Sequence, residues 1–224
     1  MSTRLHYPRP DGQEAQGSLA LPSSGTGGPS VVVLHEWWGL TGTVEKVTDR
    51  LAAEGYRALA VDYYRGYVAS SKLEAMRKRM SLDIPDVVTQ DVRGAAQYLK
   101  ASGGKTAVLG FSLGGAVATM AACQVPEFDA GISFYGIPPG KNADPGQIRI
   151  PFQAHYGLSD DWYPVPQIDA LEARMREGGV DVDFHRYEAK HGFFSTHWPE
   201  EYDAAAAEQA WGHLLRFLAA RLRG

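Results

Sequence analysis

A serine between two glycines is the residue of this chain with the clearest chemical potential. The pentapeptide GFSLG at residues 110–114 fits the pattern G-x-S-x-G, with an apolar run at 106–109 before it and a segment of small residues at 113–123 after it. A serine on a tight strand-to-helix turn adopts a strained backbone angle and projects its hydroxyl clear of the sheet. The strand and the helix then approach so closely that the positions two residues before and two residues after the serine require glycine. The pattern therefore predicts that Ser112 is a nucleophile for acyl transfer, although the pentapeptide by itself also occurs by chance.

A serine hydroxyl is a weak nucleophile, so it needs a histidine base and an acid that orients this base. On a strand-turn-helix of this type the expected chain order is serine, then an acid, then histidine. The order favours His191, in the loop KHGF at 190–193 directly after a predicted strand at 182–187. His197 is the weaker alternative, because it lies further from the strand end and next to a Trp-Pro pair.

The candidate acids lie in the loop GLSDD at 157–161, which follows a predicted strand at 150–155. The carboxyl ends of parallel strands meet at one edge of a sheet, where reactive groups gather. Asp160 is preferred to Asp161, since its shorter reach from the strand keeps the carboxylate near the histidine loop. For either residue, a solvated aspartate in a turn is the structural alternative.

The loop HEWWG at 35–39 leaves the first buried strand at its carboxyl end. A loop in this place commonly donates one oxyanion N–H, and Trp37 would supply it, while Leu113 would offer a second N–H at the start of the following helix. Glu36 stands between an apolar strand and two tryptophans, where a carboxylate needs a partner. It is either a surface loop acid or an acid held close to Ser112, and the pattern leaves both possibilities open.

The elements that must position these residues alternate along the chain. We expect strands at 31–34, 58–61, 106–109, 130–134, 150–155 and 182–187, and helices at 44–55, 69–82, 86–100, 113–123, 165–177 and 201–222. The alternation predicts one α/β domain over residues 1–224, with a mostly parallel sheet covered by helices on both faces. Residues 1–28 are predicted to form a hairpin region around Asp11-Gly12, and no separate lid domain is expected.

The composition is that of a globular protein, with 224 residues of which 44% are hydrophobic and 21% charged. The net charge of −4 argues against a nucleic-acid partner, and the single cysteine, Cys123, excludes an internal disulfide. No apolar run approaches the ~20 residues that span a bilayer, and Pro8, Pro10 and Asp11 stand where a signal peptide needs its apolar stretch. We therefore expect a cytoplasmic protein without a membrane partner, whose oligomeric state the sequence leaves open.

Six motifs in order resemble those of the dienelactone hydrolase (carboxymethylenebutenolidase) family of α/β-hydrolases, over most of the chain from about residue 10 onward. They are HEWWG at 35–39, DYY at 62–64, GFSLGG at 110–115, FYG at 134–136, GLSD at 157–160 and KHGF at 190–193. The resemblance implies the α/β-hydrolase fold, with Ser112, Asp160 and His191 as a catalytic triad. It also implies that Glu36 contacts the nucleophile at rest, and that the backbone N–H groups of Trp37 and Leu113 form the oxyanion hole.

Two positions depart from the family pattern. Ser112 stands where the best-known members carry cysteine, so the carboxylate of Glu36 loses much of its purpose in activating a thiolate, and His191 must act as a conventional base. Ser195 stands where the dienelactone-cleaving members place an arginine that grips the substrate carboxylate. Three other arginines could approach the pocket from the helical segment, namely Arg65, Arg77 and Arg79.

These observations predict a serine-dependent hydrolase that acts on small ester or lactone substrates through an acyl-enzyme, without a cofactor or a metal. Aromatic residues at strand ends, among them Trp38, Tyr64, Tyr135 and Phe193, are expected to line a short and fairly open pocket suited to a small substrate rather than a long acyl chain. The alternatives are a peptidase or acyltransferase of the same fold, or a binding module that keeps the scaffold without catalysis.

Overall fold

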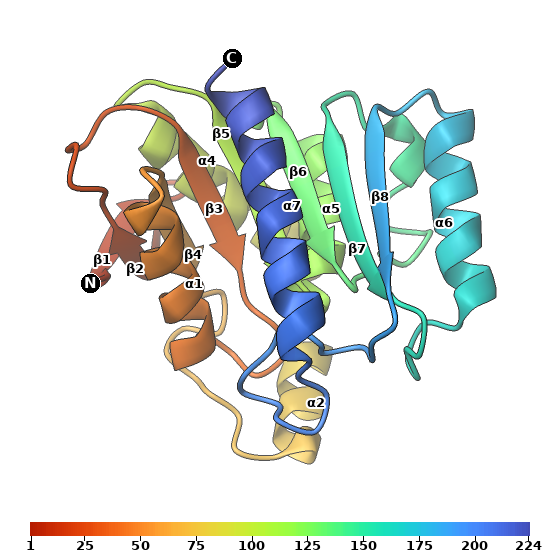
Figure 1. Ribbon diagram of the computed structural model, residues 1–224. Coiled ribbons are helices and arrows are strands. Elements are labelled where there is room, and N and C mark those ends of the chain that lie inside the picture. The colour runs from red at the N-terminus through yellow and green to blue at the C-terminus, as the bar shows by residue number, and fades with distance from the viewer.

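The computed structural model describes all residues from Met1 to Gly224 as one sheet covered by helices. The strands are β1 (Thr3–Pro8), β2 (Glu14–Ala20), β3 (Ser30–Leu34), β4 (Arg57–Val61), β5 (Thr106–Phe111), β6 (Ala130–Phe134), β7 (Phe152–Gly157) and β8 (Val182–Tyr187). The helices are α1 (Gly42–Ala53), α2 (Lys72–Met80), α3 (Ile84–Asp86), η1 (Val87–Val92), α4 (Arg93–Lys100), α5 (Leu113–Gln124), η2 (Pro145–Gln147), α6 (Val165–Glu177) and α7 (Ala204–Leu222). Figure 1 shows α1 and α7 in front of the sheet, with α4 and α5 behind it.

The sheet has the strand order β1-β2-β4-β3-β5-β6-β7-β8. The hairpin of β1 and β2 joins it antiparallel, whereas the strands from β4 across to β8 all run parallel. Every residue of β3 to β7 is buried, as expected where helices cover both faces of a parallel sheet. The predicted α/β architecture is confirmed.

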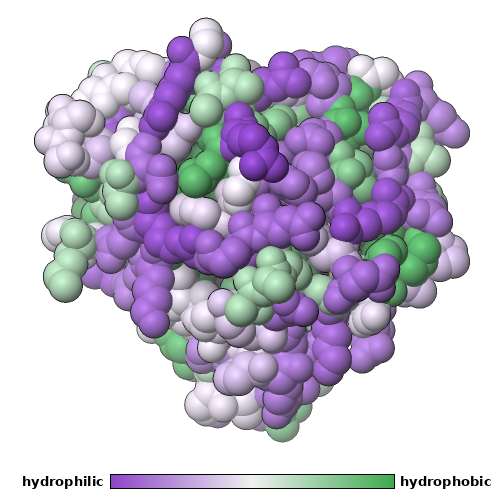
Figure 2. Space-filling view, in the orientation of Figure 1, coloured by the Kyte–Doolittle hydropathy of each residue, from purple (hydrophilic) through white to green (hydrophobic).

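The sheet divides the core into two clusters. Because successive strand residues point to opposite faces, Val31 and Val33 join a cluster with α1 and α7, while Val32 and Leu34 join one with η1, α4 and α5. The outer face over α1 and α7 is mostly hydrophilic in Figure 2. None of the helices has both the length and the apolar character that a bilayer crossing requires.

The segment between β4 and β5 differs most from the expected helices. Instead of a helix at 69–82, the structure has the shorter α2, in which Ala75 is the one buried residue. Instead of one regular helix at 86–100, α3 leads into the wider π-helical turn η1 and then α4. Pro85 sits in the first turn of this stretch, where a helix needs no backbone N–H from it.

Candidate active site

The backbone around Ser112 is strained and closely packed, as the pentapeptide predicts. Ser112 joins β5 to α5 with φ at +51°, a conformation that residues other than glycine rarely adopt. A Cβ added at Gly110 would lie 1.9 Å from the carbonyl oxygen of Gly114, and one added at Gly114 would lie 2.4 Å from that of Leu34. Both glycines are therefore required for the turn that exposes the serine.

Three side chains from three strand ends form a hydrogen-bonded chain. The Oγ atom of Ser112 lies 2.8 Å from Nε2 of His191, in the loop after β8. The other ring nitrogen of His191, Nδ1, lies 2.8 Å from Oδ2 of Asp160, in the loop after β7. Asp161 and His197, the alternatives in each loop, are exposed.

The surroundings of Asp160 fix the proton positions in this chain. Its second oxygen, Oδ1, accepts hydrogen bonds from the backbone N–H groups of Trp162 at 2.7 Å and Tyr163 at 2.9 Å. A carboxylate is an acceptor only, so Nδ1 of His191 carries the proton and donates it to Oδ2. Nε2 is then left as the acceptor for the hydroxyl of Ser112, which is the arrangement that a general base requires.

The peptide unit between Glu36 and Trp37 is held in one orientation. The carbonyl oxygen of Glu36 accepts from Nδ1 of His35 at 2.6 Å and from the backbone N–H of Gly39 at 3.3 Å. In a trans peptide the N–H points away from this carbonyl, and the N–H of Trp37 donates to no turn or loop carbonyl. The same is true of Leu113 at the start of α5, and both residues line one cavity with Ser112. Two unused donors are therefore available beside the serine.

Glu36 is buried near His191 but is not hydrogen-bonded to Ser112. Its carboxylate accepts from Oγ of Ser195 at 2.7 Å and from the phenol of Tyr135 at 3.3 Å. Burial raises the pKa of Glu36, opposed by the hydrogen bond from Ser195, the electrostatic interaction with His191 and the hydrogen bond from Tyr135. The resemblance implies that Glu36 contacts the nucleophile, but no hydrogen bond joins it to Ser112 here, because its carboxylate accepts from Ser195 and Tyr135 while Ser112 pairs with His191.

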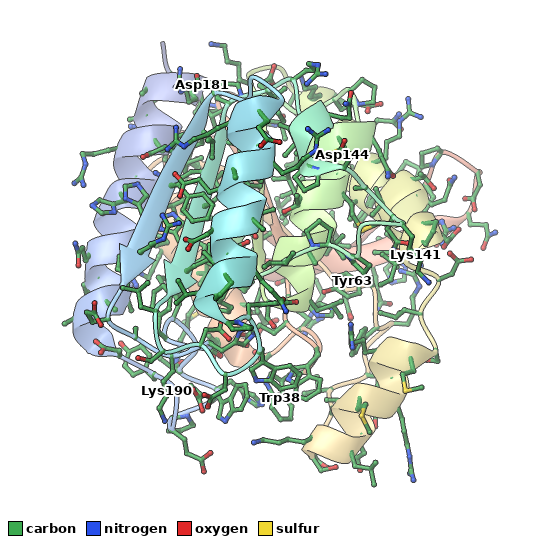
Figure 3. All side chains as sticks on the ribbon, turned by 90° about the vertical axis from the view of Figure 1, so that its right-hand side faces the viewer. Trp38, Tyr63, Lys141, Asp144, Asp181 and Lys190 are labelled. Atoms are coloured by element: carbon green, nitrogen blue, oxygen red, sulfur yellow. The ribbon has the colours of Figure 1, made fainter.

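A cavity of about 320 Å³ opens beside Ser112 and His191. Its aromatic wall differs from the sequence prediction, because it consists of Trp37, Trp162, Tyr163 and Trp198. The four residues predicted to line the pocket are buried elsewhere. Tyr64, Tyr135 and Phe193 belong to the core, and Trp38 packs against Ala69 and Ala75 beside α2 (Figure 3).

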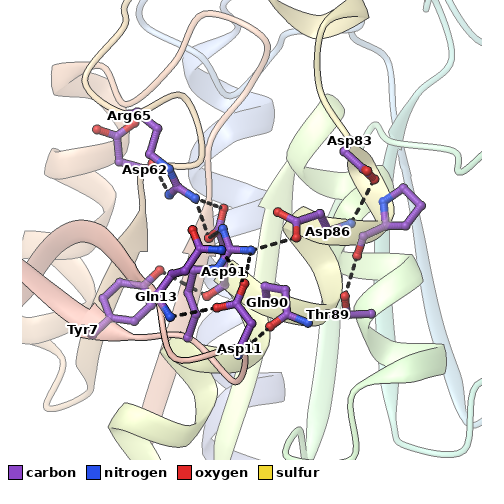
Figure 4. Close-up of polar contacts among 12 residues, drawn as sticks. Tyr7, Asp11, Gln13, Asp62, Arg65, Asp83, Asp86, Thr89, Gln90 and Asp91 are labelled. Carbon is purple, nitrogen blue, oxygen red and sulfur yellow. Dashed lines mark hydrogen bonds and ion pairs between the residues drawn. The ribbon is translucent and has the colours of Figure 1, made fainter.

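The three candidate arginines lie in different surroundings. Arg79 lines the cavity from α2, whereas Arg77 of the same helix is exposed and not part of the wall. Arg65 donates to the buried carboxylate of Asp91 at 2.7 and 2.9 Å, in the ion cluster of Figure 4. Arg65 thus ties the loop after β4 to η1 rather than facing a substrate.

The chain matches known proteins over nearly its whole length. The family model described as "Dienelactone hydrolase family" matches residues 15–222. A protein of Aquifex aeolicus, provisionally named a carboxymethylenebutenolidase, is 28% identical over 229 residues, which cover 95% of this chain and 96% of that protein. A relative of the same provisional name from Synechocystis is 30% identical over 217 residues, 87% of each chain.

Solved structures share the fold at lower identity. A dienelactone hydrolase-like promiscuous phosphotriesterase from metagenomic libraries superposes with a TM-score of 0.86 at 22% identity, covering 99% of both chains. Esterase 2 of Thermogutta terrifontis, solved in a form phosphorylated by paraoxon, gives a TM-score of 0.72 at 18% identity and covers 98% of this chain and 94% of its own.

Proposed function

Because the chain belongs to the dienelactone hydrolase family and is an ester or lactone hydrolase, we propose that Ser112 is its nucleophile and that turnover passes through an acyl-enzyme. The observation that carries the proposal is the chain of two 2.8 Å hydrogen bonds from Ser112 through His191 to Asp160. A serine with a base in reach, and a base oriented by a buried acid, is the arrangement that gives an alcohol the reactivity it lacks alone.

Acylation begins when the Oγ atom of Ser112 attacks the carbonyl carbon of the ester. Nε2 of His191 accepts the hydroxyl proton as the bond forms, and Asp160 stabilises the resulting imidazolium through its bond to Nδ1. The carbonyl oxygen takes the negative charge and is stabilised by the N–H groups of Trp37 and Leu113, a contribution of roughly 3 kcal/mol or more for each such donor. His191 then returns the proton to the leaving alcohol oxygen as the tetrahedral intermediate collapses.

Deacylation repeats these steps with water in place of the alcohol. His191 removes a proton from the attacking water, and the same two N–H groups stabilise the second oxyanion. Collapse of this intermediate releases the carboxylic acid, and Ser112 recovers its proton from His191. A lactone follows the same course, except that both products remain one molecule, a hydroxy acid.

Glu36 has a supporting position in this scheme. Its carboxylate is occupied by Ser195 and Tyr135, and the ring of Tyr135 lies 5.1 Å from that of His191. We therefore assign Glu36 to the positioning of Tyr135 and the histidine loop, and the proton transfer to His191 alone.

The test is a reaction of the intact protein with paraoxon, an organophosphate that phosphorylates activated serines. We expect stoichiometric release of p-nitrophenol, loss of p-nitrophenyl acetate hydrolysis, and a diethylphosphoryl group on the peptide that contains Ser112. The variant Ser112→Ala should show neither labelling nor hydrolysis, whereas Ser81→Ala, at an exposed serine, should behave as the wild type. Full hydrolysis by Ser112→Ala, or a label on another residue, would refute the assignment.

A further inference from the structure

One face of α5 forms the floor of the cavity beyond the serine. Leu113, Ala116, Val117 and Met120 all line the cavity, and their spacing places them on one side of the helix. From Leu113 to Met120 the helix rises by about 10 Å, at about 1.5 Å per residue. The cavity therefore extends well beyond the space that an acetyl group or a small lactone needs.

The far end of this groove is marked by Asn142. Asn142 belongs to the cavity wall, and its carbonyl oxygen accepts from Nε2 of Gln124, the last residue of α5, at 2.9 Å. The groove thus runs from the nucleophile at the start of α5 toward the last turn of the same helix. We use the name "α5 groove" for the part of the cavity between Ser112 and Asn142.

The side walls of the α5 groove are mainly apolar. Ile137 and Pro139 lie on the loop after β6, while Met80 and Ile84 come from the end of α2 and from α3. No carboxylate lines the cavity, and Arg79 is the one lysine or arginine in its wall. A long and mainly apolar groove favours an extended hydrocarbon chain over a compact polar substrate.

We propose that the α5 groove binds the acyl chain of the substrate, an unbranched chain of about six to eight carbons. Because its bonds of about 1.5 Å zigzag, an extended chain advances only about 1.3 Å per bond, so eight carbons span about 9 Å, just within the roughly 10 Å of the groove. The inference rests on the proposed function, since the chain must be attached to the carbonyl that Ser112 attacks. Where the sequence predicts a short pocket for a small substrate, the proposed α5 groove is long enough for the acyl chain of a medium-chain ester.

The position of His191 decides which side of the ester the groove receives. The leaving oxygen must lie near Nε2 of His191 to be protonated, and the rings of Trp162 and Tyr163 surround this imidazole with centroids 5.6 Å away. The α5 groove leads away from that end of the cavity, along the helix. The alcohol part therefore lies toward the aromatic wall, and the acyl chain lies along α5.

The experiment compares p-nitrophenyl esters whose acyl chains have two, four, six, eight and twelve carbons, each below its micelle-forming concentration. Transfer of a methylene from water to an apolar wall is worth about 0.8 kcal/mol, so kcat/KM should rise by up to about fourfold per added methylene. The rise should stop at about eight carbons, where the groove ends. A parallel series of acetates with lengthening alcohols should show no comparable rise.

The variant Asn142→Trp fills the far end of the groove, and Lys141→Trp is its matched control. Lys141 is the exposed neighbour in the same loop and does not line the cavity (Figure 3). We expect Asn142→Trp to lower the ratio of octanoate to acetate kcat/KM at least tenfold, and Lys141→Trp to leave this ratio unchanged. The wild-type series tests the proposal even if the variant does not fold.

The outcomes separate the two proposals. Hydrolysis of short esters without a gain from longer acyl chains would overturn the α5 groove while leaving the proposed function intact. A gain in the alcohol series in place of the acyl series would also overturn it. Failure to hydrolyse any ester, without labelling by paraoxon, would refute the proposed function itself.

Discussion

Protonation of His35 should destabilise the loop that carries the proposed oxyanion donor. The imidazole is fully buried, stacked on Tyr63 with ring centroids 3.7 Å apart, and its Nδ1–H holds the carbonyl of Glu36. Its Nε2 is buried without a hydrogen-bond partner, so a proton added there would find no acceptor. Burial accordingly lowers the pKa of His35 from 6.5 to about 4.

The sign and size of the effect follow from this lowered pKa. The unfolded chain binds the proton more readily than the folded protein. The contribution of His35 to the free energy of unfolding is therefore fully present above about pH 7 and falls as the pH drops from 6.5 toward 4. At about 1.4 kcal/mol per pKa unit, the full difference corresponds to about 3.5 kcal/mol, of which about 2.5 kcal/mol is lost by pH 4.5.

The assay is urea unfolding of the wild type and of His35→Asn at pH 7.5 and pH 4.5. The amide N–H of asparagine can replace Nδ1–H but does not titrate, so the variant should lose about 2.5 kcal/mol less than the wild type between these two pH values. His6→Asn, at an exposed histidine of β1, serves as the control and should follow the wild type. Equal losses in wild type and His35→Asn would show that the buried imidazole is not the source of acid sensitivity.

Three further predictions concern the site. Asp160→Asn should lower kcat for a p-nitrophenyl ester by about 10⁴ with an unchanged circular dichroism spectrum, because the amide favours the wrong tautomer of His191; a loss below tenfold would contradict this role. Ser195→Ala removes the 2.7 Å bond to Glu36 and should raise the pKa of that carboxyl further, so the variant should be less stable than the wild type by about 2 kcal/mol at pH 7.5 and by less at pH 4.5, measured by urea unfolding. Gly110→Ala would place a Cβ 1.9 Å from a backbone oxygen and should cost more than about 4 kcal/mol, so a soluble and active variant would argue against the tight turn.

The sequence predicted the residues of the hydrogen-bonded chain because each stands directly after a strand. Strands β6 and β8 and helix α6 begin and end at the predicted residues, since apolar runs and helical spacing are local signals. The carboxyl ends of parallel strands then bring residues distant in sequence to one edge, so the loops of Asp160 and His191 could be named without coordinates.

The cavity wall could not be predicted in the same way. Trp37 lines the cavity while its neighbour Trp38 packs beside α2, and which of two adjacent loop residues faces a cavity depends on backbone torsions that the residue types do not encode. The contact between Nδ1 of His213 in α7 and the phenol of Tyr187 in β8, at 3.1 Å, joins two elements whose packing the apolar spacing does not specify. The π-helical turn at Val87–Val92 likewise depends on packing against α5 and has no signal in the apolar spacing.

The slight attachment of α2 has a consequence for how this scaffold can change. The helix supplies Arg79 and Met80 to the cavity but buries only Ala75, and none of Ser112, Asp160 and His191 lies on it. Residue exchange or grafting in this helix can therefore alter which molecules enter the cavity while the proposed catalytic groups keep their geometry. Directed evolution confined to α2 should therefore change the range of substrates with little loss of folding stability.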